Sequence, residues 1–309
     1  MPKRDKNFME RFEHGLNTSD LEKSKITAKV LGYGEISTIF QIGADDRWAY
    51  KRMPLFNSIK GAQEYAAIYR QYCKHLASAG LNIPEDELQF VSQPGRPIVL
   101  YIIQRQFPAE WFAHKLIHEI PDLNRAVLFN RVVSEACQVW TYNSEMGPAV
   151  EIALDGQLSN WVFENGDIEN GKIYYIDTST PLFRLDGVEQ LNPELILQSA
   201  PSFLRWIIRR LFLKDVMERY YDQQQVFTDL AANLHKEQRP DLIAVVIEAI
   251  NIHIKSEIAQ ITEKDIDKYY REDKLIWTLF LNFRRLDRWI KTSIFHKRYE
   301  FILPGKIKR

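Results

Sequence analysis

Cysteine is scarce in this sequence. Among 309 residues there are two cysteines, Cys73 and Cys137, and both lie in stretches whose pattern is apolar and helical. Two isolated thiols are too few for a disulfide framework or for a cysteine-ligated metal cluster. We therefore expect a protein that folds without covalent cross-links in a reducing compartment such as the cytoplasm.

Long apolar runs are also missing. The most apolar stretch, FLRWIIRRLFL, is interrupted by Arg205, Arg209 and Arg210. No segment approaches the roughly 18 uninterrupted apolar residues of a membrane span. The N-terminal stretch MPKRDKNFMERFEHG is charged and lacks the apolar core of a signal peptide. The sequence thus predicts a cytoplasmic protein without a membrane span.

Charge of one sign is not in excess, because 41 Lys and Arg balance 41 Asp and Glu. Overall charge therefore favours neither nucleic acid nor an acidic partner. The motifs G-x-S-x-G, H-E-x-x-H and C-x-x-C are absent, so hydrolase, zinc-protease and thiol-redox chemistry lack a starting residue. His114 and His118 have a spacing that zinc sites use, but no third ligand accompanies them, and a polar helix face is the favoured interpretation.

The first hundred residues carry many β-branched and apolar residues and predict a small β-rich unit. Three strands come first, around a glycine-bearing turn. A helix that begins at Ser58 and ends at Gly80 follows, and two more strands complete the unit. The predicted strands cover residues 26–31, 36–42, 47–53, 88–92 and 97–107.

From Pro108 onward the apolar spacing is that of long helices, interrupted by a small β-island between Gly147 and Pro181. We therefore predict an α+β chain with a β-rich N-lobe (1–103), a hinge (104–108) and a helical C-lobe (109–309). The predicted helices of the C-lobe cover residues 111–120, 123–142, 193–199, 201–221, 223–235, 242–256 and 273–295, and the two strands of the island cover 160–164 and 172–177.

Phosphate-binding chemistry is suggested by three features of the N-lobe. Gly32 and Gly34, in the turn VLGYGEISTIF between two strands, would let the backbone approach a bulky anion and offer it amide groups. Lys51, on the third strand, could neutralise phosphate oxygens if a carboxylate held it, and Glu64 in the following helix is the candidate. Taken singly, each feature is better explained as a hairpin turn, a solvated lysine or a surface glutamate.

The β-island carries oxygen ligands. Asp155 and Asn160 are five residues apart in a loop, and the apolar strand IYYI delivers Asp177 at its end. Carboxylate and amide oxygens suit Mg²⁺, and one carboxylate would remain to accept a proton from an attacking hydroxyl. A charged residue that ends a buried strand usually has a function, so this is the strongest fragment of the sequence.

These features occur in an order that resembles the protein-kinase-like superfamily, most closely its branch of aminoglycoside and choline phosphotransferases. The motifs that carry the resemblance extend over residues 26–182. The resemblance implies a two-lobed kinase-like fold, the use of ATP and Mg²⁺, and phosphate transfer to a hydroxyl of a small molecule. The resemblance implies that Gly32 and Gly34 cover the phosphates, and that Lys51, paired with Glu64, contacts the α- and β-phosphates. It implies that Gln104 to Gln106 form the hinge, whose backbone meets the adenine. It also implies that Asp155 is the catalytic base and that Asn160 and Asp177 are magnesium ligands.

The sequence departs from protein kinases at four places. Ser37 stands where a third loop glycine is expected, and Ala153-Leu154 precede the proposed base without the usual arginine. Gln157 replaces a lysine or histidine, and Thr178-Ser179 follow Asp177 in place of Phe-Gly. The missing arginine argues against a regulated protein kinase. The changed surroundings also leave a second hypothesis, a nucleotide-binding pseudokinase or scaffold without turnover.

The C-terminal stretch FRRLDRWIKTSIFHKRYEFILPGKIKR is basic with interleaved aromatic residues. It could bind an anionic lipid surface or nucleic acid, which would make the chain a helical interaction protein. The favoured interpretation is a docked amphipathic helix with a solvated basic face and a frayed tail. The expected partners are therefore a nucleotide and a small-molecule acceptor, whose identity no C-terminal motif reveals.

Overall fold

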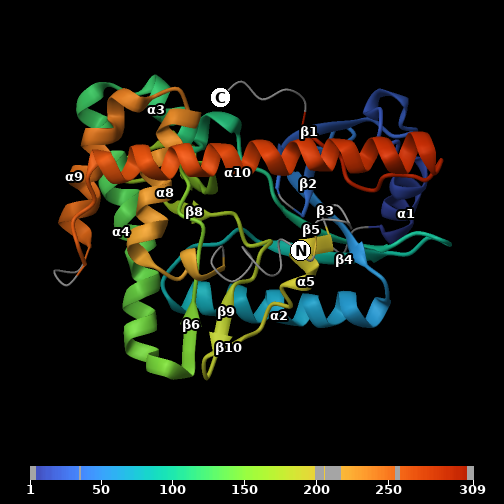
Figure 1. Cartoon of the computed structure of the whole chain (residues 1–309), viewed down its shortest axis with the longest axis horizontal. Helices are drawn as coiled ribbons and strands as arrows, with labels where there is room; N and C mark the ends of the chain where they lie inside the picture. The colour runs from blue at the N-terminus through green and yellow to red at the C-terminus, as the bar shows by residue number, and fades with distance from the viewer. Residues whose placement is uncertain (1–4, 35, 199–204, 206–216, 255–257, 305–309) are drawn as a thin grey trace.

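The structure is a computed structural model that describes residues 5–34, 36–198, 205, 217–254 and 258–304 (Figure 1). The N-terminal elements are α1 (Lys6–Gly15), β1 (Ala28–Tyr33), β2 (Thr38–Ile42), β3 (Trp48–Phe56), α2 (Ile59–Ser78), β4 (Asp86–Val91) and β5 (Ile98–Arg105), with a short 3-10 turn at Leu21–Lys23. The C-terminal elements are α3 (Ala113–Glu119), α4 (Asp122–Met146), β6 (Val150–Ile152), β7 (Trp161–Phe163), β8 (Ile173–Tyr175), β9 (Phe183–Leu185), β10 (Val188–Glu189), α5 (Glu194–Gln198), α8 (Gln223–Lys236), α9 (Ile243–His253) and α10 (Glu263–Trp289), with short 3-10 turns at Ala109–Trp111, Gly147–Ala149, Leu158–Asn160, Glu164–Gly166 and Pro240–Leu242 and a π-helical turn at Ile290–Ile294.

The N-terminal part is built on one antiparallel sheet in the order β1-β2-β3-β5-β4. Apolar residues of α2 pack on one face, with Met53 and Ile102, and apolar residues of α1 pack on the other, with Tyr50 and Tyr101. The predicted order of three strands, one helix and two strands is confirmed, as is the α+β class with an antiparallel N-terminal region and a helical C-terminal part.

Strand β3 is central and is buried along most of its length, because helices cover both faces of the sheet. Successive side chains of a strand point to opposite faces. Lys51 and Met53 therefore lie on the α2 side, while Tyr50 and Arg52 lie on the α1 side. This alternation separates two charged systems, one around Lys51 and one around Arg52.

Helix α1 was not predicted from the sequence. The carboxylate of Asp5 accepts a hydrogen bond from the backbone N–H of Asn7 and caps the helix. Met9, Phe12 and Glu13 are fully buried against the sheet. The high charge of the segment obscured an amphipathic helix whose buried face includes one carboxylate, Glu13.

The C-terminal part packs α4, α8 and α9 around a large apolar core to which Phe129, Phe227 and Ile250 contribute. The two predicted island strands are confirmed as the antiparallel pair β7–β8. A second small sheet, β10-β9-β6, was not predicted, since its strands of two or three residues are too short to show a periodicity.

Helix α10 starts ten residues earlier than predicted, at Glu263 instead of Asp273. Thr262 and Asp265 form a capping box, in which each side chain accepts a hydrogen bond from the backbone N–H of the other residue. The predicted helices at 193–199, 223–235 and 242–256 correspond to α5, α8 and α9. Most of the predicted helix at 201–221 lies outside the described residues.

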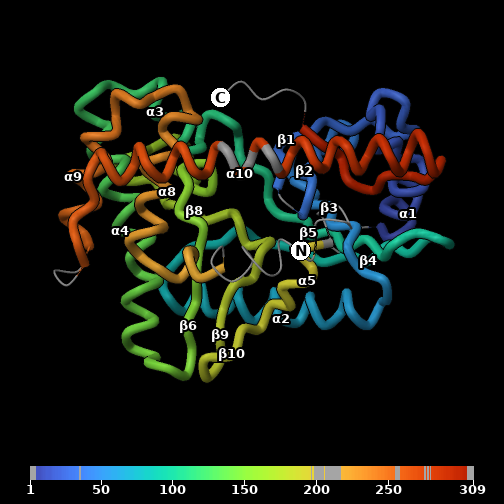
Figure 2. Tube along the Cα trace, viewed as in Figure 1, coloured from blue at the N-terminus to red at the C-terminus, as the bar shows by residue number. Residues whose placement is uncertain are grey.

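The C-terminal segment reaches from one part of the molecule to the other. Helix α10 packs on α8 and runs across the molecule towards α1, as the red end of the chain shows in Figures 1 and 2. Beyond it, Tyr299 and Leu303 are buried, and Thr18 donates a hydrogen bond of 2.7 Å to the carbonyl of Tyr299. The expectation of a frayed tail is therefore wrong as far as residue 304, because the segment up to that residue is docked. None of the described helices is both long and apolar enough to cross a membrane.

Candidate functional site

Lys51 is one of the residues through which the two parts of the chain meet. Its side chain is 6% exposed, and its Nζ donates a hydrogen bond of 2.6 Å to the carbonyl of Ile176. The same Nζ lies 3.8 Å from Oδ1 of Asp177. Burial lowers the pKa of Lys51, while the carboxylates of Asp177 and Asp86 oppose that shift. Lys51 of the N-terminal sheet and Asp177 of the C-terminal part therefore belong to one site.

The segment after β8 carries the second half of this site. The N–H of Ile176 donates to the carbonyl of Asn160 over 3.0 Å, which ties the end of β8 to the loop before β7. The hydroxyl of Ser179 donates to Oδ1 of Asp177 over 3.0 Å. Asp177 is 32% exposed, so one end of this otherwise buried arrangement faces solvent.

Asp155 lies in the loop between β6 and β7. Its Oδ1 accepts a hydrogen bond of 3.0 Å from the N–H of Gln157, and its own N–H donates to the hydroxyl of Tyr175 over 3.2 Å. The amide nitrogen of Asn160 donates to the carbonyl of Asp155 over 3.1 Å. A chain of hydrogen bonds through Ile176 thus joins Asp155, Asn160 and Lys51. Asp177 adjoins this chain through its ion pair with Lys51.

Glu64 is not the partner of Lys51. Its side chain is 63% exposed, and it lies 3.8 Å from Lys60, which is 85% exposed, on the outer face of α2. The buried face of α2 is formed by other residues, among them Tyr65 and Tyr69, so position 64 points about a quarter turn away from the site. The predicted Lys51–Glu64 pair is therefore wrong, and the carboxylate beside Lys51 is Asp177.

A row of tyrosines on α2 takes the place that was predicted for Glu64. Tyr65 donates a hydrogen bond of 2.5 Å to the carbonyl of Ser179, and Tyr72 donates one of 2.6 Å to the carbonyl of Ala153. The hydroxyl of Tyr69 is 3.3 Å from that of Thr178. All three tyrosines are at most 1% exposed. Their spacing of four and three residues was visible in the sequence and marks one helical face.

Gly34 lies in the turn between β1 and β2, as predicted, whereas Gly32 still belongs to β1 and is paired with Ile39. The ladder between these strands is irregular between Val30 and Gly32, and the N–H of Gly34 donates to the carbonyl of Ser37 over 3.0 Å. A Cβ atom at Gly34 would come within 2.8 Å of the Ser37 hydroxyl, so a larger residue there would force the Ser37 side chain to move. Glu35 is outside the described residues.

Gln104 and Gln106 are not equivalent. Gln104 still belongs to β5 and is paired with Ala49 and Asp86 in the sheet, and its buried amide donates to the hydroxyl of Thr178 over 2.9 Å. The N–H of Gln106 donates to the carbonyl of Arg47 over 2.8 Å, so this backbone group is already bonded within the chain. The side-chain oxygen of Gln106 is buried and has no hydrogen-bond partner in the described part of the chain.

Gln157 connects the Asp155 loop to α8. Its amide nitrogen donates to Oδ2 of Asp229 over 3.0 Å, and its amide oxygen lies 3.4 Å from the Nζ of Lys236. Burial raises the pKa of Asp229 to about 6, against the hydrogen bond from Gln157 and with the help of the nearby Asp273. The sequence showed Gln157 as a departure from the family pattern, and the structure shows that it anchors the loop.

No cluster of three or more His, Cys, Asp and Glu side chains is placed to hold a metal ion within the described ranges. His114 is half-buried and His118 exposed, one turn apart on α3. Asn160 and Asp177 could supply one amide and one carboxylate oxygen, a donor set that Mg²⁺ commonly combines with substrate and water oxygens.

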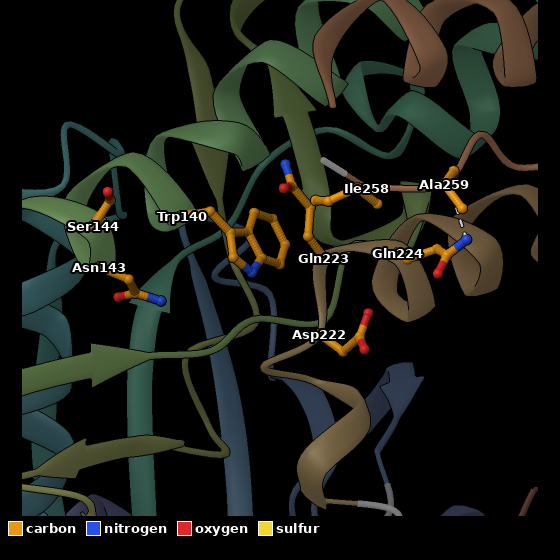
Figure 3. A pocket seen from close by; sticks show the side chains of 8 residues that line it. All are labelled: Trp140, Asn143, Ser144, Asp222, Gln223, Gln224, Ile258 and Ala259. Atoms are coloured by element: carbon orange, nitrogen blue, oxygen red, sulfur yellow. Dashed lines mark hydrogen bonds between the residues drawn. The ribbon is translucent and has the colours of Figure 1, made fainter. Parts of the chain in front are cut away.

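A cavity of about 610 Å³ beside α4 and α8 is lined by none of these residues (Figure 3). Trp140 and Gln223 line it, and Gln224 donates a hydrogen bond of 3.1 Å to the carbonyl of Ala259 at its edge. The adjoining residues 255–257 are outside the described part of the chain. No site is assigned to this cavity.

Comparison with known proteins places this arrangement in a family. A family model described as a family of unknown function, DUF6206, matches residues 17–288 and therefore most of the chain, including every site residue above. The chain belongs to this family. No curated protein matches it. One similar solved structure is "WaaP in complex with acyl carrier protein", with 13% identity, coverage of 71% of this chain and 92% of that chain, and a TM-score of 0.34. A TM-score of this size does not establish a common fold.

Proposed function

We propose that this chain is a magnesium-dependent phosphotransferase that moves the terminal phosphoryl group of ATP to a hydroxyl of a small molecule. The observation that carries the proposal is the contact of Lys51 with the Asp177 segment, at 2.6 Å to Ile176 and 3.8 Å to Asp177. A buried lysine on a strand and a carboxylate at the end of another strand are what a polyphosphate and its metal ion require.

The polar groups of the site fit ATP and Mg²⁺. Asn160 uses its amide nitrogen on the carbonyl of Asp155, which leaves its amide oxygen as the acceptor for a cation. The hydrogen bond from Ser179 reaches Oδ1 of Asp177, and in the described residues no hydrogen bond reaches Oδ2. Asn160 and Asp177 would therefore hold Mg²⁺, which neutralises charge on the transferred phosphoryl group when bound. Lys51 would contact the α- and β-phosphates.

The adenine position is supported by one orphaned polar atom. The buried side-chain oxygen of Gln106 would accept a hydrogen bond from an exocyclic amine. The backbone N–H of Gln106 is held by Arg47, so we assign adenine recognition here to the side chain and not to this backbone group. Gly32 and Gly34 would cover the phosphates, and residues 1–103 and 109–309 would form the two lobes of a kinase-like fold around the hinge at 104–108.

Asp155 would act as the base. The attacking hydroxyl would lose its proton to a carboxylate oxygen of Asp155 while a new P–O bond forms and the bond to the ADP leaving group breaks. The hydrogen bonds of Asp155 to Gln157 and Tyr175 would fix the loop during this step. A small-molecule acceptor is favoured because Ala153 and Leu154 replace the residues that serve an activation loop.

A nucleotide-binding pseudokinase is the second candidate, and one observation favours it. Lys51 is not paired with a helical glutamate, since Glu64 is exposed and α2 presents tyrosines to the site. A lysine held by Asp177 instead would bind phosphate without the usual alignment for transfer.

Turnover separates the two candidates. We expect the protein with Mg²⁺ and γ-labelled ATP to release ADP and to transfer label to an acceptor from a panel of hydroxylated metabolites. Asp155→Asn should abolish transfer while nucleotide binding persists, because Asp155 is proposed to hold neither metal nor phosphate. Nucleotide binding without ADP release in the wild type would favour the pseudokinase, and the absence of any nucleotide binding would reject both.

A further inference from the structure

The end of α10 exposes a row of large apolar side chains. Leu286, Trp289, Ile294 and Phe295, which we call the α10-end patch, are 44%, 55%, 54% and 61% exposed. A single exposed apolar residue is ordinary, but four exposed apolar side chains within ten residues indicate a binding surface.

The π-helical turn contributes to this row. Leu286 and Trp289 are three residues apart and adjoin on one face of α10. Ile294 is five residues after Trp289, a spacing that an α-helix would rotate away. In the π-helical turn Ile290–Ile294 each turn contains more residues, and the N–H of Phe295 donates to the carbonyl of Ile290. Ile294 is thereby brought back towards the face of Trp289.

The exposed charges of the segment that carries the patch are positive. Residues 284–304 contain six Lys and Arg, of which Arg284 is buried, and two acidic residues, although the whole chain is balanced. Both acidic side chains are withdrawn: Asp287 is 7% exposed beside Lys291, and Glu300 is 12% exposed among three arginines. Among the described residues, Arg288 and Lys297 have no ion pair. The exposed side chains of this segment are therefore apolar and cationic.

We propose that the α10-end patch docks the protein on an anionic lipid surface. Exposed Trp, Phe and Leu flanked by Lys and Arg fit the boundary between lipid headgroups and acyl chains, with the rings inserted and the cations on phosphates. A second copy of the chain fits less well, since a two-fold contact would set the same cations opposite one another. Nucleic acid would leave the aliphatic Leu286 and Ile294 without a role. This inference is independent of the proposed phosphotransfer.

Vesicle co-sedimentation tests the proposal. We expect the full-length protein to bind vesicles of phosphatidylcholine with 30% phosphatidylserine at least tenfold more tightly than pure phosphatidylcholine, and less tightly as salt rises. The double change Trp289→Ser/Phe295→Ser should weaken binding at least tenfold. Lys297→Gln and Arg288→Gln should each weaken it roughly fivefold.

Matched controls guard against general effects. Leu123→Ser replaces an apolar residue that is 88% exposed on α4, and Lys60→Gln removes a cation that is 85% exposed on α2. Both should leave binding unchanged, and melting curves should show every variant folded. The proposal is overturned if the wild type ignores anionic vesicles, if patch variants bind as well as the controls, or if the patch instead drives dimer formation or binding of an oligonucleotide.

Discussion

Lys51 shows how much of a site a single residue can reveal. The sequence predicted that Lys51 lies on a strand. It also predicted the order of Asp155, Asn160 and Asp177, because each of them adjoins an apolar element. The carboxylate beside Lys51 could not be predicted, because packing decides which face of α2 points towards the site. The aromatic residues on one face of that helix were the better clue to which side is buried.

Asp229 supplies a prediction at the same scale. Its pKa is raised to about 6 by burial, above the 3.8 of the unfolded chain. The ionised form is therefore disfavoured in the folded protein, and stability falls as pH rises from 3.8 through 6. Asp229→Asn should be more stable than wild type at pH 8, by about 2 kcal/mol given its partial exposure, and nearly equal at pH 3.5. Urea unfolding at both pH values checks this, and equal stability at pH 8 would contradict it.

At the scale of elements, α2 is tied to the site by its tyrosine row. Tyr65→Phe removes the hydrogen bond to Ser179 and leaves that buried carbonyl without its donor. We expect a loss of about 1–2 kcal/mol in the free energy of unfolding. We also expect weaker nucleotide affinity, because the Asp177 segment loses an anchor.

The matched control lies one residue away. Glu64→Ala changes an exposed side chain on the same helix and should alter neither stability by more than about 0.5 kcal/mol nor nucleotide affinity. Chemical denaturation and nucleotide titration of both variants measure the difference. If Glu64→Ala proved the more damaging change, the tyrosine row would not be what holds the site.

Helix α10 illustrates why element boundaries escaped prediction. The stretch TEKD contains the Thr262–Asp265 capping box, but it precedes a charged turn with few apolar residues, so periodicity pointed to a later start. Thr262→Ala should cost about 1 kcal/mol, since the cap satisfies a backbone N–H at the helix start. Thermal unfolding against wild type measures this loss, and an unchanged melting temperature would place the start of the helix elsewhere.

For the molecule as a whole, both ends of the chain converge on one buried ionic network. Glu13 of α1 accepts hydrogen bonds from Arg52, Arg96 and Tyr101, and Arg52 also bonds Glu300 of the C-terminal segment. The sequence could predict the sheet and the helices by periodicity. It could not predict this network, because contacts between residues up to 248 positions apart leave no local pattern.

The network makes folding sensitive to acid. Burial opposes ionisation of Glu13, but Arg52, Tyr101 and Arg96 outweigh it and lower the pKa to about 2, below the usual 4.5. The stability it contributes is present above pH 4.5 and is lost as pH falls towards 2, about 3 kcal/mol in all. Glu13→Gln should lose that pH dependence and be destabilised at pH 7 by about 3 kcal/mol or more.

The exposed Glu10 on the same helix is the comparison for this prediction. Glu10→Gln removes a surface pair with Lys6 and should change stability by no more than about 0.5 kcal/mol. Urea unfolding from pH 2.5 to 7 measures all three proteins. A Glu13→Gln protein that kept the acid sensitivity of the wild type would show that other carboxylates govern it.

Nucleotide binding is the central claim, and one measurement tests it most directly. Melting curves with saturating Mg²⁺ and ATP should show stabilisation of the wild type and of Glu64→Ala, about 2.7 kcal/mol at a hundredfold excess over the dissociation constant. Lys51→Met and Asp177→Ala should bind at least tenfold more weakly and lose at least about 1.4 kcal/mol of that stabilisation. Equal stabilisation of all four proteins, or none of the wild type, would contradict a nucleotide site at Lys51 and Asp177.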